Sequence, residues 1–195
     1  MKISAKTKVC AVIGDPVEHS LSPAIHNAAF KELGLDFVYV AFHVPRGQGR
    51  KAAEAVRTLG IRGLSVTIPH KMDIIPALDE VDEVARGIGS INTVVNREGR
   101  LYGCSTDGVG ALRALEAEGV KPEGKRVLLI GSGGAARAIA FALSTLTPLP
   151  KLRILGIDEP ERKALWQDLK DRTCLLYTSD AADEGLGVDL GGRRI

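Results

Sequence analysis

The chain has 195 residues, of which 45% are apolar and 26% charged, and its formal net charge at pH 7 is +2. This composition is typical of a soluble globular protein and excludes a disordered chain. Nucleic-acid binding is not expected, because the charge is small and only 4% of the residues are aromatic. No run approaches about 18 consecutive apolar residues, and the basic amino terminus leads into a strand, so we expect a cytoplasmic protein with no membrane span.

The first half of the chain alternates apolar runs with segments of helical spacing. Strands are predicted over residues 9–13, 37–42, 64–66, 91–95 and 101–102, and helices over 24–33, 49–59, 71–78 and 82–87. Such alternation predicts an α/β fold, with a mainly parallel sheet covered by helices on both faces. A further helix over 106–118, which Gly119 ends, is expected to join this domain to a second one.

The second domain begins with a strand at 126–130, followed by the glycine-rich turn 131–136, a helix at 137–144 and a strand at 152–157. This order is typical of a Rossmann-type unit, in which glycines let the backbone approach a pyrophosphate and the helix start offers free N–H groups. Asp158, which closes the second strand, is predicted to bind a ribose hydroxyl. The residues predicted to hold the cofactor are Gly131, Ser132, Gly133, Gly134, Ala135 and Asp158.

A complete domain of this kind contains two such halves, so residues 124–173 predict a partial one. The predicted organisation is a substrate-binding catalytic domain at 1–105, a linking helix at 106–123 and a partial dinucleotide-binding domain at 124–173.

Two loops place small hydroxyl groups beside a charge. One runs from Ser65 through Thr67 to Lys71, and the other contains Thr106 and Asp107. Catalytic side chains collect in such loops after strands. A free lysine has a pKa of about 10.4, so Lys71 serves proton chemistry only if its surroundings tune that pKa, and a nearby Asp107 would fix the ammonium in place. The alternative is an ordinary surface ion pair.

A third polar loop spans residues 14–23 and carries Ser20 and Ser22. Because the two serines alternate, they point the same way if the segment is extended, and their hydroxyls would suit a carboxylated or polyhydroxylated small molecule. Ser22 is also a good helix N-cap before Pro23. Asn92 either ties a turn or binds a ligand hydroxyl.

The histidines at 19, 26, 43 and 70 share no metal-ligand spacing, and no metal is predicted. His26 is interpreted as a helix-surface or core residue and His70 as part of a pocket wall. The cysteines at 10, 104 and 174 also lack metal spacing, so free thiols are expected.

Five ordered motifs, at residues 14–23, 66–71, 91–93, 105–108 and 131–136, resemble the shikimate dehydrogenase family, and the resemblance extends over residues 8–172. It implies NADP-dependent reduction of 3-dehydroshikimate to shikimate in the synthesis of aromatic amino acids. By position, it implies that Lys71 and Asp107 form the catalytic pair. It also implies that the substrate is held by Ser20 and Ser22 at its carboxylate and by Thr67, Asn92 and Asp107 at its ring hydroxyls, with Ser65 and Thr106 beside them.

Two departures from the family pattern matter. Ser65 stands where the family often has Asn, which leaves quinate as an alternative substrate. Residues 157–159, or 156–158 if aligned one place earlier, replace an Asn-Arg-Thr that is common in NADP-using members. The cofactor is expected to be NADP or NAD. Because Asp158 would repel the 2′-phosphate of NADP, we lean toward NAD.

The alternatives are a quinate/shikimate dehydrogenase that prefers NAD and a non-catalytic substrate-binding protein. The expected partner is a small-molecule substrate, and a homodimer is the assembly we consider.

Residues 174–195 show neither helical nor strand periodicity. They resemble a translated sequencing adapter, of transposase type over 174–184 and of flow-cell type over 187–195. We expect a non-native tail that follows the amino-terminal part of a longer enzyme, and we expect the 195-residue chain itself to be inactive.

Overall fold

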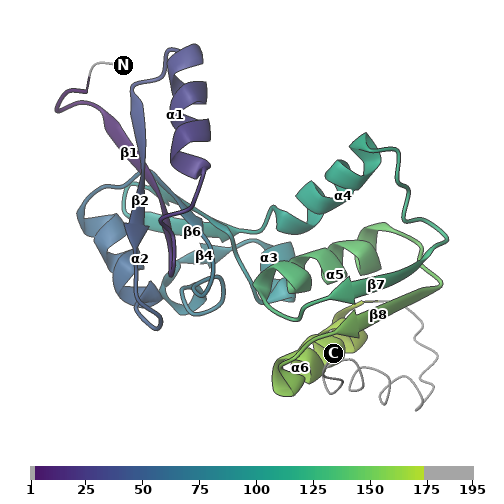
Figure 1. The fold of residues 1–195 in the computed structure, drawn as a ribbon. Coiled ribbons are helices and arrows are strands. Elements are labelled where there is room, and N and C mark those ends of the chain that lie inside the picture. The colour runs from purple at the N-terminus through teal and green to yellow at the C-terminus, as the bar shows by residue number, and fades with distance from the viewer. Residues whose placement is uncertain (1–2, 174–195) are drawn as a thin grey trace. The chain divides into compact units, whose positions relative to one another are not determined.

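The computed structural model describes residues 3–173, and the expected non-native tail therefore lies outside the described residues. The chain forms two compact units (Figure 1). Of the described residues, the first unit contains 3–86 and 90–105, and the second contains 87–89 and 106–173. Within the described range, no helix is both long and apolar enough to cross a membrane.

The first unit is built on a six-stranded sheet of order β2-β1-β3-β5-β6-β4. The pairs β1–β2, β1–β3 and β4–β6 are parallel, whereas β5 runs antiparallel to both β3 and β6. The sheet is therefore mainly parallel, as predicted. The strands are β1 (Lys8–Gly14), β2 (Phe37–His43), β3 (Gly63–Val66), β4 (Glu80–Val81), β5 (Thr93–Arg97) and β6 (Arg100–Cys104).

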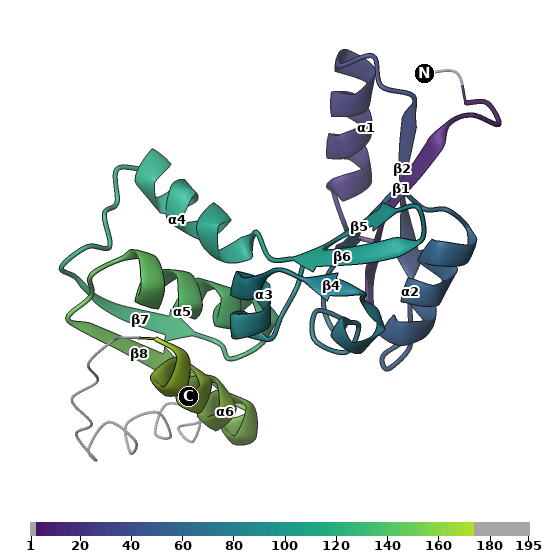
Figure 2. The ribbon, with the colours of Figure 1, turned by 180° about the vertical axis from the view of Figure 1, so that it is seen from behind.

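Helices cover both faces of this sheet (Figure 2). Ala11 and Ile13 of β1 pack in the main core with Ala53 of α2 (Gly49–Thr58). The intervening Val12 packs on the other face with Tyr39, where Phe30 of α1 (Ser22–Glu32) joins it. This alternation follows from the two-residue repeat of a strand, and it confirms the predicted arrangement of helices on both faces.

The helix predicted over residues 71–78 is wrong. The structure has successive turns there, which end in the short 3₁₀ helix η1 (Ile75–Ala77). Pro76 explains the difference, because proline has no N–H to donate to the carbonyl of Met72 and so interrupts an α-helix over 71–78. The helix predicted over 82–87 is present as α3 (Glu83–Ile88).

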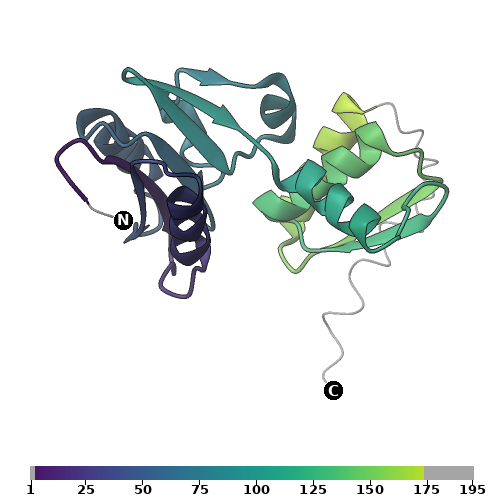
Figure 3. The same cartoon turned by 90° about the horizontal axis from the view of Figure 1, so that it is seen from above.

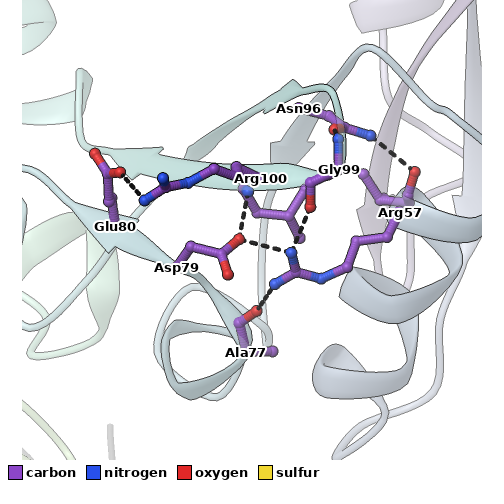
Figure 4. Close-up of polar contacts among 9 residues, drawn as sticks. Arg57, Ala77, Asp79, Glu80, Asn96, Gly99 and Arg100 are labelled. Carbon is purple, nitrogen blue, oxygen red and sulfur yellow. Dashed lines mark hydrogen bonds and ion pairs between the residues drawn. The ribbon is translucent and has the colours of Figure 1, made fainter.

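A polar network anchors the β5–β6 hairpin to α2 and η1 (Figure 4). The Arg57 guanidinium donates to Asp79 at 2.6 Å and to the carbonyl of Ala77 at 2.8 Å. Asp79 also accepts from the backbone N–H of Leu101 at 2.6 Å. One carboxylate therefore joins the helix, the segment before β4 and the start of β6.

The second unit contains a parallel pair, β7 (Arg126–Ile130) and β8 (Lys151–Leu155), with helices α4 (Asp107–Ala117), α5 (Gly134–Leu146) and α6 (Glu159–Arg172). The helices α4 and α5, teal and green, lie side by side (Figure 3). A Cβ on Gly108 would stand 2.4 Å from the carbonyl oxygen of Ala138, so glycine is what permits this close approach. The order of strand, glycine-rich turn, helix and strand is the predicted one. Gly119, with φ +72°, ends the helical run as expected.

Candidate active site

Backbone hydrogen bonds tie together the ends of three strands in the first unit. The N–H of Thr67, just beyond β3, donates to the carbonyl of Ile13 in β1 at 3.0 Å. The N–H of Val66 donates to the carbonyl of Asn92 at 2.7 Å, and the N–H of Asn92 donates to the carbonyl of Cys104 at 3.1 Å. The segments that carry Thr67 and Asn92 therefore meet at one edge of the sheet.

Lys71 belongs to the same edge, because its carbonyl accepts from the N–H of Ile91 at 2.9 Å. Its side chain is half-buried. The preceding His70 is not a pocket-wall residue: it is fully buried, with Nε2 2.7 Å from the carbonyl of Val44 and Nδ1 3.2 Å from the Asp73 carboxylate. His70 fixes the backbone that presents Lys71.

Ser65 has a partner that the sequence did not reveal. Its hydroxyl accepts from the Tyr39 hydroxyl at 2.6 Å, and the Tyr39 ring stacks on His26 at 4.3 Å between ring centroids. Burial raises the pKa of Tyr39, so the phenol is protonated at neutral pH. Strand register places both side chains on one face of the sheet with β1 between them, since Cys10 pairs with Tyr39 and its same-face neighbour Val12 pairs with Ser65.

Ser20 lies in the loop between β1 and α1, Ser22 lies at the start of α1, and the segment between them is not extended. Ser22 is the first residue of α1, Leu21 before it has helical angles, and no side chain caps the helix. Neither the alternation argument nor the capping alternative therefore holds for Ser22. The two serines are nevertheless adjacent, because the N–H of Ser22 donates to the Ser20 hydroxyl at 3.3 Å.

Thr106 and Asp107 belong to the second unit. Asp107 is the first residue of α4 rather than part of a loop, and Thr106 is the N-cap position, without a side-chain capping bond. Asp107 is half-buried. A carboxylate is favoured in the first turn of a helix, where the free N–H groups carry partial positive charge.

The glycine-rich turn has the geometry that a dinucleotide cradle needs. Gly131 has φ +115°, which favours glycine, and its N–H donates to the carbonyl of Leu155 at 2.6 Å. Gly133 is the N-cap of α5. A Cβ on Gly156 would lie 2.7 Å from the Ser132 hydroxyl, so the end of β8 comes close to the loop. Gly131, Ser132, Gly133, Gly134 and Ala135 thus fit a pyrophosphate at the start of α5.

Three acids, Asp158, Glu159 and Glu161, closely follow β8, and the sequence predicted a cofactor contact for Asp158 alone. The strand ends at Leu155, earlier than expected, and Asp158 is the N-cap of α6: its Oδ1 accepts from the N–H of Glu161 at 2.8 Å. Glu161 accepts from the Ser132 hydroxyl at 2.8 Å. No spacing rule points to this contact, because Glu161 lies three residues into α6.

Two other kinds of site, a metal site and a cysteine nucleophile, can be compared with the side chains of residues 3–173. Within that range no group of His, Cys, Asp or Glu side chains is arranged to hold a metal ion. Cys10 and Cys104 are free thiols, and burial raises the pKa of both, so they are poor nucleophiles at neutral pH.

Comparisons with known proteins agree on one family. Residues 12–94 match the model of the shikimate dehydrogenase substrate binding domain. The NADP(+) shikimate dehydrogenase of Methanocaldococcus jannaschii is 42% identical over 190 residues, which cover 97% of this chain and 66% of that protein. That alignment extends into residues 174–195. The NADP(+) shikimate dehydrogenases of Alkaliphilus metalliredigens and Moorella thermoacetica are 49% and 52% identical and are matched over 50% and 49% of their own length.

Solved structures give the same result. A crystal structure of shikimate dehydrogenase in complex with NADP+ superposes with a TM-score of 0.80 at 44% identity, over 87% of this chain and 58% of that one. The Listeria monocytogenes shikimate 5-dehydrogenase, solved with shikimate and NAD, gives a TM-score of 0.79 at 35% identity, over 89% of this chain and 61% of that one. This chain therefore belongs to the shikimate dehydrogenase family.

Proposed function

We propose that the protein to which this chain belongs is a shikimate dehydrogenase, which reversibly reduces 3-dehydroshikimate to shikimate for aromatic amino-acid synthesis. The observation that carries the proposal is the sheet edge where the segments of Thr67, Lys71 and Asn92 are tied by backbone hydrogen bonds. Hydroxyl, ammonium and amide groups gathered at one edge suit a small polyhydroxylated acid.

The substrate is held by short polar side chains. Ser20 and Ser22 bind its carboxylate, and Thr67, Asn92 and Asp107 bind its ring hydroxyls. Ser65 and Thr106 complete the lining. Hydroxyls and amides donate and accept without the desolvation cost of a further charge, so they can distinguish hydroxyl positions on the ring.

Lys71 and Asp107 manage the proton. During reduction the Lys71 ammonium donates to the carbonyl oxygen of the substrate, and in the reverse direction the amine accepts the hydroxyl proton. Asp107 holds the ammonium and a neighbouring hydroxyl in place. The nicotinamide cofactor, when bound, supplies or accepts the hydride. The glycine-rich turn, with Gly131, Gly133 and Gly134, holds the pyrophosphate.

We assign residues 1–105 to substrate binding and catalysis, 106–123 to the link, and 124–173 to part of the dinucleotide-binding domain. The cofactor is NADP or NAD. The relatives are named for NADP(+), and the argument for NAD rests on acids after β8. A homodimer is part of the proposal, and sedimentation of the full-length protein checks it.

The decisive experiment uses the full-length protein, because the present chain spans only about half to two thirds of its relatives. NAD(P)H formation from shikimate is followed by absorbance. Lys71→Met is expected to lower kcat by roughly 100-fold or more, since a positioned acid–base group contributes about that much, with little change in KM. Lys51→Met, an exposed lysine of α2, is the matched control and should behave as the parent. Absence of turnover by the parent protein would refute the proposal.

The two alternatives give different results in the same assay. A quinate/shikimate dehydrogenase would turn over quinate at a rate comparable to shikimate, an outcome that Ser65 in place of the usual Asn makes worth testing. A non-catalytic binding protein would retain affinity for shikimate without turnover. The presence of both Lys71 and Asp107 favours the enzyme over the binding protein.

A further inference from the structure

Arg137 of α5 is a buried charge that the proposed mechanism does not use. It is only 3% exposed, although it lies in the first turn after Gly133, the N-cap of α5. Its guanidinium forms an ion pair with Asp168 of α6, and its Nε donates to the carbonyl of Ile88 at 2.8 Å. Because a guanidinium presents its donors in a rigid plane, the two contacts together fix Ile88 relative to α5 and α6.

Ile88 is part of a short segment that belongs to the second unit. Residues 87–89 are in that unit, whereas the residues on both sides of them are in the first. The Ile88 side chain is buried in the same apolar core as Leu165. Arg172 adds a second contact, because it donates to the carbonyl of Gly87 at 2.7 Å. Two cationic side chains thus hold the last carbonyls of α3, where a helix end carries partial negative charge.

Gly89 shows how closely the guanidinium approaches this segment. Its φ is +68°, a backbone conformation that favours glycine, and an added Cβ would lie 3.4 Å from Nη2 of Arg137. A Cβ on Gly87, two residues earlier, would meet nothing within 4 Å. Arg137 therefore lies against the turn at which the chain leaves the second unit.

The segment leads directly to side chains that the proposed function assigns to the substrate. The N–H of Ile91 donates to the carbonyl of Lys71 at 2.9 Å, and Asn92 follows. Ile88 lies only a few positions before Ile91, and each residue of a chain spans at most about 3.6 Å. A shift of the Ile88 carbonyl is therefore carried along a short stretch of backbone to Asn92.

We propose that Arg137 is a positioning residue for substrate binding: by holding the Ile88 carbonyl, it fixes the segment that presents Asn92 to the ring hydroxyls of shikimate. The inference rests on the proposed dehydrogenase function and adds a residue to the substrate side of its site. Arg137 belongs to the helix whose start is assigned to the cofactor. An arginine with a purely structural role there would affect dinucleotide affinity or stability, and not the substrate.

Steady-state kinetics of the full-length protein separate the two roles. Arg137→Lys keeps a cation beside Asp168 but loses the planar fork that reaches Asp168 and Ile88 together. We expect KM for shikimate to rise roughly three- to tenfold, as for one hydrogen bond, with kcat nearly unchanged. The Kd of the preferred dinucleotide, NADP+ or NAD+, is measured by isothermal titration calorimetry. It should equal that of the parent, because the glycine-rich turn is intact.

Two further variants keep the test independent of folding. Asp168→Asn retains the buried arginine and removes its charged partner, so it should raise KM for shikimate in the same direction. Leu152→Ala of β8 is the matched control: Leu152 is buried in the same core as Ile88, and its truncation destabilises the second unit without removing a contact to the Ile88 carbonyl. It should lower the melting temperature and leave KM for shikimate unchanged.

A double variant tests the route through Asn92. Asn92→Ala should itself raise KM for shikimate, and adding Arg137→Lys should raise it no further, because both changes act on the same contact.

Four outcomes would overturn the inference. They are an unchanged KM in both Arg137→Lys and Asp168→Asn, a rise in KM that Leu152→Ala reproduces, a loss of dinucleotide affinity as the only effect, and a further rise in the double variant. Each of them leaves the dehydrogenase function standing. Absence of turnover by the parent, in contrast, contradicts the proposed function itself.

Discussion

Asp158 stabilises α6 through its side chain. Its Oδ1 accepts from the N–H of Glu161, which would otherwise lack a partner in the helix. We expect Asp158→Ala to lower the free energy of unfolding by about 1 kcal/mol, the usual value of an N-cap. Asp158→Asn keeps an acceptor and should retain most of the stability. Urea denaturation measures both, and equal losses in the two variants would show that charge rather than capping matters at this position.

Tyr39 positions Ser65. Because the phenol donates to Ser65 Oγ, the hydroxyl proton of Ser65 is left to donate elsewhere. If Ser65 contacts the substrate, Tyr39→Phe should raise KM for shikimate about three- to tenfold, as expected for one hydrogen bond, and leave kcat and the KM of the cofactor nearly unchanged. Adding Tyr39→Phe to Ser65→Ala should then have no further effect on KM. Independent effects in the double variant would contradict the coupling.

The contact between α4 and α5 depends on one of two glycines in α4. A Cβ on Gly108 would lie 2.4 Å from the carbonyl oxygen of Ala138 and 2.8 Å from the Cβ of Ala142, whereas a Cβ on Gly110 meets nothing within 4 Å. We expect Gly108→Ala to cost about 1–3 kcal/mol through overpacking. Gly110→Ala should instead stabilise the helix by up to about 1 kcal/mol. Thermal denaturation of both variants checks the opposite signs, and equal shifts would refute the close approach.

The network around Asp79 predicts sensitivity to acid. The hydrogen bond from Arg57, followed by that from Leu101, holds the pKa of Asp79 below its usual value of 3.8. When folding lowers the pKa of a carboxyl, the carboxylate stabilises the fold at any pH above the pKa of the unfolded state. This contribution is lost as the pH falls through the lower pKa of the folded state. Asp79→Asn should therefore lower the melting temperature at about pH 6. This difference from the parent should shrink below pH 3.8. Glu54→Gln, an exposed acid of α2, should show no such pH-dependent difference.

At the scale of the whole chain, the sequence predicted what depends on local pattern. Both bounds of the strand over 126–130 are predicted correctly, because an apolar run followed directly by glycines is compatible with few other structures. The helix α6 was not predicted: its buried residues are only Leu165 and Leu169, which give little apolar periodicity.

The candidate site likewise contains features that the sequence predicts and contacts that it does not. The position of Ser65 near the end of β3 and of Lys71 in the loop after it follows from the apolar run and the turn residues. The partners of Ser65 and Ser132 do not, because strand register and helix packing bring Tyr39 and Glu161 to them from distant positions. Such contacts are set by tertiary structure, and the spacing of residues along the chain does not predict them.

The outer face of the β7–β8 pair predicts how this 195-residue chain behaves in solution. Leu128 and Ile130 are 54% and 79% exposed, whereas Val127 and Leu129 point to the opposite face and pack against the core of the second unit. Exposed neighbouring apolar side chains promote self-association.

The double variant Leu128→Thr with Ile130→Thr keeps good strand formers while removing apolar surface. We expect less association in sedimentation velocity and a change in unfolding free energy within about 0.5 kcal/mol for each substitution. The matched pair Val127→Thr with Leu129→Thr removes packed side chains, so it should lower stability and leave association of the folded chain unchanged. Unchanged association in the first pair would show that this face does not drive it.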